Sequence, residues 1–305
     1  MQRRTHGIMP AWPLTTLVVT AIYLGLAALK AATISNHEND MPLEKDGTGK
    51  RWVEMHFVTP GTAEQVWQAM ATGAGNAAWF TRATIEERVG GALKFHFGPE
   101  ISSAGEVTIW EPPHRFGYVE REWNEGAPPV ATEIAIASRA DRQCTVRMVH
   151  SLVSAKDTWD DQLENFERGW PAFFEVLRIY LANFAGMNAA SFQAMTSVEG
   201  EHLAVWTGLV NKLDLSGANV GERRSITQPA QLSGIVERIQ QDSKVRVITL
   251  RLDSPTPGVA LIGTYGSTSN VTASVSVFFY GNEADATATA NSREWQGWLR
   301  DNAGK

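Results

Sequence analysis

Large apolar side chains recur along one helical face between Phe166 and Phe184, in the stretch FERGWPAFFEVLRIYLANF. Their spacings of four, three, four, four and three residues match the period of a helix. The pattern predicts a long helix over residues 158–184, with a kink or restart near Pro171. A stripe this bulky needs a broad apolar surface to pack against. It consists of Phe166, Trp170, Phe173, Leu177, Leu181 and Phe184.

The chain before this helix mostly alternates apolar and polar positions with the period of two that is typical of strands. A strand is predicted at 51–58, and two short helices follow it, the first with Thr62 as its expected N-cap. Five more strand-like runs are separated by glycine and proline turns. This order predicts an α+β fold in which the long helix covers the apolar face of a curved antiparallel sheet. The five runs are 92–98, 104–110, 115–123, 130–139 and 143–153.

Five segments, in this order and spacing, resemble the Hsp90-ATPase-activator-like branch of the START/Bet v1-like (polyketide cyclase-like) superfamily. The segments are TPGTAEQVWQAM, AAWFTRATIEERVGGALKF, GEVTIWEPPHRFGYV, CTVRMVHSLV and GWPAFFEVLRIYL. The resemblance covers residues 52–185, a little under half of the chain. It implies the helix-grip fold, in which a strongly bent antiparallel sheet wraps a long C-terminal helix and leaves a hydrophobic cavity between them.

Residues 191–305 repeat this order of elements less clearly. The segment SVEGEHLAVWTGLVNKL, residues 197–213, resembles TPGTAEQVWQAM and precedes five strand-like runs, and the tryptophan-bearing segment SREWQGWLRDN closes the chain as a shorter helix. We interpret this part as a second, degenerate helix-grip-like domain; the alternative is an unrelated small α+β domain. Because a shorter helix covers less of a sheet, we expect this half to bury its remaining apolar face against the first half or another subunit.

Residues 1–40 are a separate hydrophobic segment with a linker. Arg3 and Arg4 precede an apolar run at 11–29, whose length just spans a bilayer core. Three interpretations stay open: a membrane anchor, a cleaved signal, or a mis-assigned start upstream of Met41. We expect cytoplasmic domains, anchored to the membrane if residues 11–29 belong to the native protein.

Composition narrows the function classes. Hydrophobic residues make up 43% and charged residues 20% of the chain, as in globular proteins, and the net charge of −6 predicts no nucleic-acid partner. The single cysteine, Cys144, excludes an internal disulfide framework. The seven histidines lack metal-ligand spacing, and no nucleotide-binding loop or hydrolase motif is present. We therefore expect no metal and no cofactor.

Polar groups that face the sheet interior are the candidates for chemistry. In CTVRMVHSL, Val146, Met148 and His150 share one parity and should face the long helix. His150 either contacts a ligand or is a core histidine satisfied by the backbone, and Tyr118 either presents a hydroxyl or packs in the core. The predicted ligand-binding residues are Trp79, Phe80, Trp110, Tyr118, Met148, His150, Trp170, Phe173, Phe174 and Leu177.

These observations favour a non-catalytic carrier or sensor that binds a hydrophobic small molecule in the helix-grip cavity. One alternative is a protein-interaction or chaperone-associated module, as the resemblance implies. Another is a cyclase-like or hydrolase-like enzyme that uses His150 or Tyr118 as acid or base. As partners we expect the small molecule, self-association, and a membrane contacted through the N-terminal segment.

Overall fold

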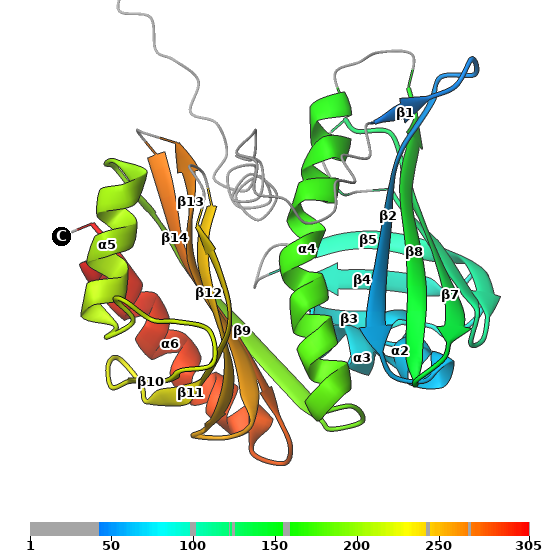
Figure 1. Ribbon diagram of the computed structural model, residues 1–305. Helices are drawn as coiled ribbons and strands as arrows, with labels where there is room; N and C mark the ends of the chain where they lie inside the picture. Colours follow the sequence, from blue (N-terminus) through cyan, green and yellow to red (C-terminus); the bar gives the residue numbers. More distant parts are fainter. Residues whose placement is uncertain are drawn as a thin grey trace, which may run out of the picture.

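Two antiparallel sheets lie side by side with a long helix between them (Figure 1). The computed structural model describes residues 43–97, 102–121, 123, 126–154, 159–241, 245–267 and 270–304. The predictions for residues 1–40 lie outside these described residues. Among the described helices, none is both long enough and apolar enough to cross a membrane.

The first sheet has eight strands in the order β1-β2-β8-β7-β6-β5-β4-β3. All six strands that were predicted for this half are observed, and they are its six longest strands. The strands β1 and β3 were not predicted, because each is too short to show an alternating pattern. The strands are β1 (Glu44–Lys45), β2 (Lys50–Pro60), β3 (Arg82–Ile85), β4 (Ala92–His96), β5 (Ser102–Glu111), β6 (Arg115–Glu120), β7 (Val130–Arg139) and β8 (Gln143–Val153).

Three helices belong to this half: α2 (Ala63–Ala71), α3 (Gly73–Ala77) and α4 (Asp160–Asn183). Thr62 is the N-cap of α2, as predicted, and forms a capping box with Gln65. The long helix α4 lies against β2 and β8, which confirms the α+β helix-grip arrangement. It runs through Pro171 without a restart.

The second sheet has six strands in the order β10-β11-β12-β13-β14-β9, and the helices α5 (His202–Lys212) and α6 (Ala284–Asn302) lie on one side of it (Figure 1). The strand β9 was not predicted. The closing helix α6 has 19 residues against 24 in α4, so it is less shortened than the sequence indicated. The strands are β9 (Ala189–Val198), β10 (Arg223–Ile226), β11 (Leu232–Gln241), β12 (Val245–Ser254), β13 (Gly258–Ser267) and β14 (Asn270–Tyr280).

The other face of the second sheet packs against the first half, as expected from its uncovered apolar side chains. Val245, Val247 and Phe278 belong to the same buried cluster as the α4 side chains. The Tyr280 ring stacks on Phe184 with centroids 4.6 Å apart, and its hydroxyl donates to the carbonyl of Ala78 at 2.9 Å. The two halves therefore share this apolar core, and a second core lies between the second sheet and the helices α5 and α6.

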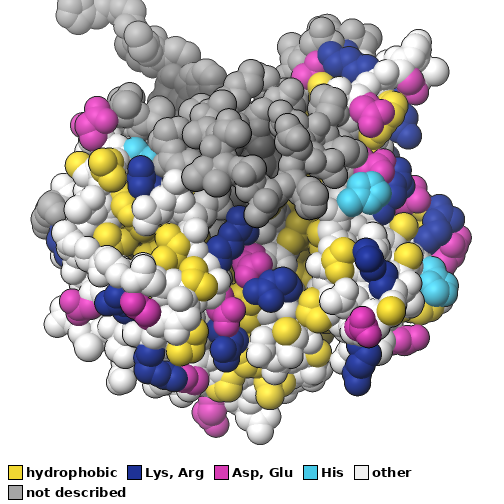
Figure 2. Space-filling model, in the orientation of Figure 1, with side chains coloured by type: hydrophobic (Ala, Val, Ile, Leu, Met, Phe, Trp, Pro, Cys, Tyr) yellow, Lys and Arg dark blue, Asp and Glu magenta, His cyan; other side chains and the backbone are white. Residues whose placement is uncertain are grey.

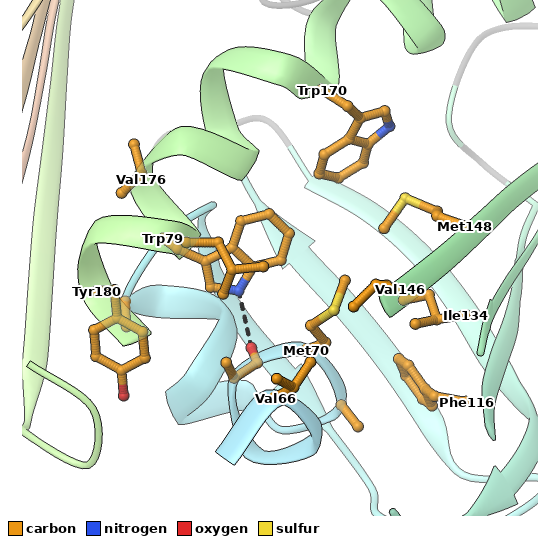
Figure 3. Packing of buried hydrophobic residues seen from close by; sticks show 14 of the residues in the cluster. Val66, Met70, Trp79, Phe116, Ile134, Val146, Met148, Trp170, Val176 and Tyr180 are labelled. Carbon is orange, nitrogen blue, oxygen red and sulfur yellow. Dashed lines mark hydrogen bonds between the residues drawn. The ribbon is translucent and has the colours of Figure 1, made fainter. Parts of the chain in front are cut away.

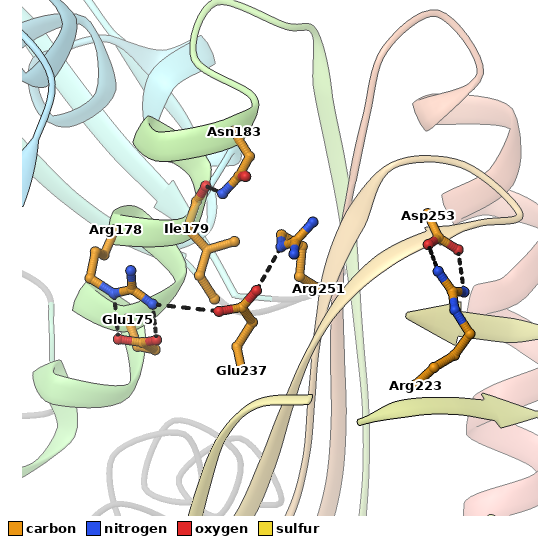
Figure 4. A network of polar contacts seen from close by, with 8 residues as sticks. All are labelled: Glu175, Arg178, Ile179, Asn183, Arg223, Glu237, Arg251 and Asp253. Carbon is orange, nitrogen blue, oxygen red and sulfur yellow. Dashed lines mark hydrogen bonds and ion pairs between the residues drawn. The ribbon is translucent and has the colours of Figure 1, made fainter. Parts of the chain in front are cut away.

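Ion pairs join the halves beside this core (Figure 4). Glu237 on β11 accepts from Arg251 on β12 at 2.6 Å and lies 3.9 Å from Arg178 on α4, which also pairs with Glu175 at 2.7 Å. Figure 2 shows basic and acidic side chains intermixed on the same face of the molecule. Of these contacts only Arg178–Glu237 crosses between the halves, and a partly exposed pair of this kind contributes at most about 1 kcal/mol to stability.

Candidate functional site

A small cavity lies between α4 and the first sheet. Its volume is about 10 Å³, which is the space needed for about one water molecule. This is far smaller than the hydrophobic cavity that the family resemblance implies. The lining residues are Phe80, Phe95, Phe97, Tyr118, Glu120, Val130, His150 and Trp170.

Aromatic rings fill the space around this cavity. Trp170 on α4 stacks on His150 with centroids 5.6 Å apart and on Phe174 at the same distance. Phe80, which follows α3, packs 4.7 Å from Trp170 and edge-on 5.1 Å from Phe173. Aromatic rings at these distances bury apolar surface and also prefer particular relative orientations.

His150 faces the helix, as the strand parity predicted, and Val146 and Met148 are buried on the same face. Its Nδ1 is hydrogen-bonded to the hydroxyl of Thr132, its cross-strand partner on β7, at 2.8 Å. Burial lowers the pKa of His150 to about 3, because the charged imidazolium is costly away from water. The ring is therefore neutral at pH 7.

Glu120 is the polar residue that the sequence analysis missed. It ends β6, is only 8% exposed, and its Oε1 has no hydrogen-bond partner among the described residues. Burial raises the pKa of this carboxyl to about 7. A signal was available, since Glu120 shares its parity with the inward residues Phe116 and Tyr118.

The predicted ligand-binding residues fall into two groups. Four line the cavity, and burial raises the pKa of one of them, Tyr118, far above its ordinary value. The other six pack around the cavity or away from it, and as ligand contacts all ten stay predictions. The lining group is Phe80, Tyr118, His150 and Trp170, and the packing group is Trp79, Trp110, Met148, Phe173, Phe174 and Leu177.

Two of the packing residues have clear structural roles. The indole of Trp79 donates to the carbonyl of Ala69 at 2.9 Å and is fully buried (Figure 3). Trp110 lies 4.9 Å from Trp67 of α2 and 5.6 Å from Phe116, in a different part of the core. Trp79 is therefore held by a hydrogen bond within the fold, and Trp110 by ring packing.

Comparison with known proteins identifies one family. Residues 60–182, less than half of the chain, match the family model described as activator of Hsp90 ATPase homolog 1-like protein. No curated protein matches.

Solved structures with a similar chain path are distant. CalU16 from Micromonospora echinospora is 18% identical, with 47% of this chain and 83% of that chain covered and a TM-score of 0.38. The di-domain ARO/CYC BexL from the BE-7585A biosynthetic pathway is 12% identical, with coverages of 84% and 99% and a TM-score of 0.39. The Aha1 dimer from Colwellia psychrerythraea is 19% identical, with coverages of 43% and 95% and a TM-score of 0.36. At these values the likeness carries no information on function.

Proposed function

Because residues 60–182 form a domain of the activator of Hsp90 ATPase homolog 1-like family, we propose that this half is a small-molecule binding module. The site lies between α4 and the first sheet, at the cavity lined by Glu120 and His150. Its ligand is an apolar molecule that carries one N–H or O–H group. The apolar part contacts the aromatic side chains, and the polar group donates a hydrogen bond to Glu120.

The observation that carries this proposal is the buried carboxyl of Glu120. Buried polar atoms are almost always hydrogen-bonded in folded proteins, and an unmatched buried oxygen costs about 1–3 kcal/mol. Oε1 of Glu120 has no such partner within hydrogen-bond geometry among the described residues, although the neighbouring Ser103 hydroxyl lowers the pKa of the carboxyl in part. A carboxyl whose pKa is shifted to about 7 in a cavity lined by aromatic rings is typical of a ligand site.

The present cavity of about 10 Å³ requires side chains to move before a larger molecule enters. Phe80 is the ring best placed to do so, because it is only partly buried and belongs to the segment after α3 rather than to a sheet or to α4. Each 100 Å² of apolar ligand surface that is buried in place of the Phe80 contacts contributes about 2.5 kcal/mol to the free energy of binding.

N-phenyl-1-naphthylamine tests the proposal, since it is neutral and apolar, has one N–H group, and fluoresces more strongly away from water. We expect a saturable increase in fluorescence with the full chain. The Phe80→Ala variant should bind more tightly because it opens space, and Glu120→Leu more weakly because it removes the acceptor. Glu106→Gln, an exposed carboxyl on the neighbouring strand β5, is the matched control.

The proposal is wrong if neither the wild-type chain nor Phe80→Ala binds the probe, or if Glu120→Leu binds it as tightly as Glu106→Gln does. The two alternatives stay predictions. A chaperone-associated role is supported by the family description alone. A cyclase-like role would use Glu120 for proton transfer in preference to His150, because only the carboxyl titrates near pH 7.

A further inference from the structure

A larger hollow lies in the second half of the molecule, where α5 covers the sheet. Its volume is about 240 Å³, and it is lined by α5, the loop after α5 and the adjacent ends of β11 and β12. Trp206 and Ile248 form a buried apolar floor, and Leu203 stands at the edge with 58% of its surface exposed. On the same measure of volume, this hollow is many times larger than the cavity of about 10 Å³ in the first half, which has room for about one water molecule.

One charged side chain, Arg246, lines this hollow among the described residues. The alternation of side chains along β12 explains why Arg246 points toward α5. Val245 and Val247 face the first half, whereas Ile248 belongs to the second core, on the α5 side of the sheet. Arg246 is paired in register with Thr264 of β13. Its guanidinium therefore lies on the same face of the sheet as α5, beside an apolar floor.

Among the described residues, Arg246 has no acidic partner like those of Arg223 and Arg251 on the same sheet. Arg223 pairs with Asp253, and Arg251 pairs with Glu237. For Arg246, by contrast, the structure of the described residues gives no ion pair, and its Nε is buried without a hydrogen-bond partner. A partly buried guanidinium without an anion is unfavourable unless something else supplies one.

We propose that this hollow binds a small molecule with one carboxylate and an apolar body. The carboxylate accepts two parallel hydrogen bonds from Arg246, the geometry that guanidinium groups favour. The hydroxyls of Thr207 and Ser216, which also line the hollow, complete its polar side, and the body lies on Trp206 and Ile248. A phosphate monoester fits less well, because its second negative charge finds no partner among the lining residues.

The test uses 3-phenylpropanoate as the probe, with 3-phenylpropanamide and 2-phenylethyl phosphate as matched compounds, in calorimetric titrations of the full chain. We expect the carboxylate to bind more tightly than either. Arg246→Gln should weaken its binding by roughly ten- to a hundred-fold, and Arg246→Lys should weaken it less because the charge remains. Arg223→Gln, which removes an exposed and already paired arginine on β10, should leave the affinity unchanged.

A second variant keeps the test independent of any folding defect at Arg246. Thr207 is exposed on α5 at the edge of the hollow, so Thr207→Trp should fold normally and block entry. The proposal is overturned if Arg246→Gln or Thr207→Trp binds the carboxylate like the wild-type chain, if the amide or the phosphate binds as tightly, or if no carboxylate binding is detected. Glu120→Leu should not change this affinity, so the outcome is separate from that of the first site.

Discussion

Replacing Glu120 with glutamine should change how the stability of the protein depends on pH. Burial raises the pKa of this carboxyl from 4.5 to about 7. Below pH 4.5 the carboxyl is protonated in both the folded and the unfolded chain, so it does not change how the free energy of unfolding depends on pH. Between these values only the folded chain holds the proton, so the free energy of unfolding falls as pH rises. The pKa difference of about 2.5 corresponds to roughly 3 kcal/mol of stability, which is lost in full above pH 7.

His150 acts in the opposite direction. Its pKa falls from 6.5 to about 3 on folding, so between these values only the unfolded chain binds the proton. The stability from this residue is complete above pH 6.5 and is lost as pH falls towards 3, by roughly 5 kcal/mol in total. From pH 4.5 to 6.5 the two effects oppose each other and nearly cancel. In this pH range the free energy of unfolding of Glu120→Gln should therefore increase by about 1.4 kcal/mol per unit of rising pH. That of His150→Gln should decrease by a similar amount.

Urea unfolding of the wild-type chain and both variants between about pH 4.5 and 8 measures these slopes. The difference between Glu120→Gln and the wild-type chain should grow by roughly 3 kcal/mol across this range, in favour of the variant at high pH. Glu106→Gln controls for the loss of one surface carboxyl and should follow the wild-type curve. If the curves of Glu120→Gln and the wild-type chain are parallel, the carboxyl is not buried as described and the proposed ligand site loses its basis.

Three further changes test the fold itself. Tyr280→Phe leaves the carbonyl of Ala78 without its partner between the halves, so urea unfolding should show a loss of about 1–3 kcal/mol. Gly105→Ala would place a Cβ atom 2.3 Å from the carbonyl oxygen of Val119, so a thermal melt should show a loss of at least about 2 kcal/mol. Leu177→Ala removes a fully buried side chain of α4 and should lower the free energy of unfolding by about 2–5 kcal/mol in urea.

Alternation predicted most of the first sheet, and it failed where the strand itself is irregular. Strict alternation along β5 would place Trp110 on the same face as Glu106 and Thr108. In the structure, β5 has a register shift between Val107 and Ile109, which inserts one residue and reverses the parity after it. Trp110 therefore packs inward, opposite Phe116. A bulge depends on pairing with β6, so local sequence does not reveal it.

The strand β9 was missed for a different reason. Its sequence, AASFQAMTSV, consists mostly of small residues, so the difference between its two faces is weak. It becomes a strand by pairing with β14 along its whole length. For Glu120, the parity of the strand predicts the direction of the side chain. Its burial could not be predicted in the same way, because the rings that exclude water come from α4 and β4.

The helix α4 has two packed faces, and this limits how the first site can open. One stripe, with Trp170 and Leu177, faces the first sheet, but Tyr180 and Phe184 contact Tyr280 of the second sheet. A shift of α4 away from the first sheet would compress or break those contacts. Space for a ligand must therefore come from side chains, chiefly Phe80, rather than from movement of the helix. Tight binding of the probe by Phe80→Ala, together with unchanged affinity in Tyr280→Phe, is the pattern that this arrangement requires.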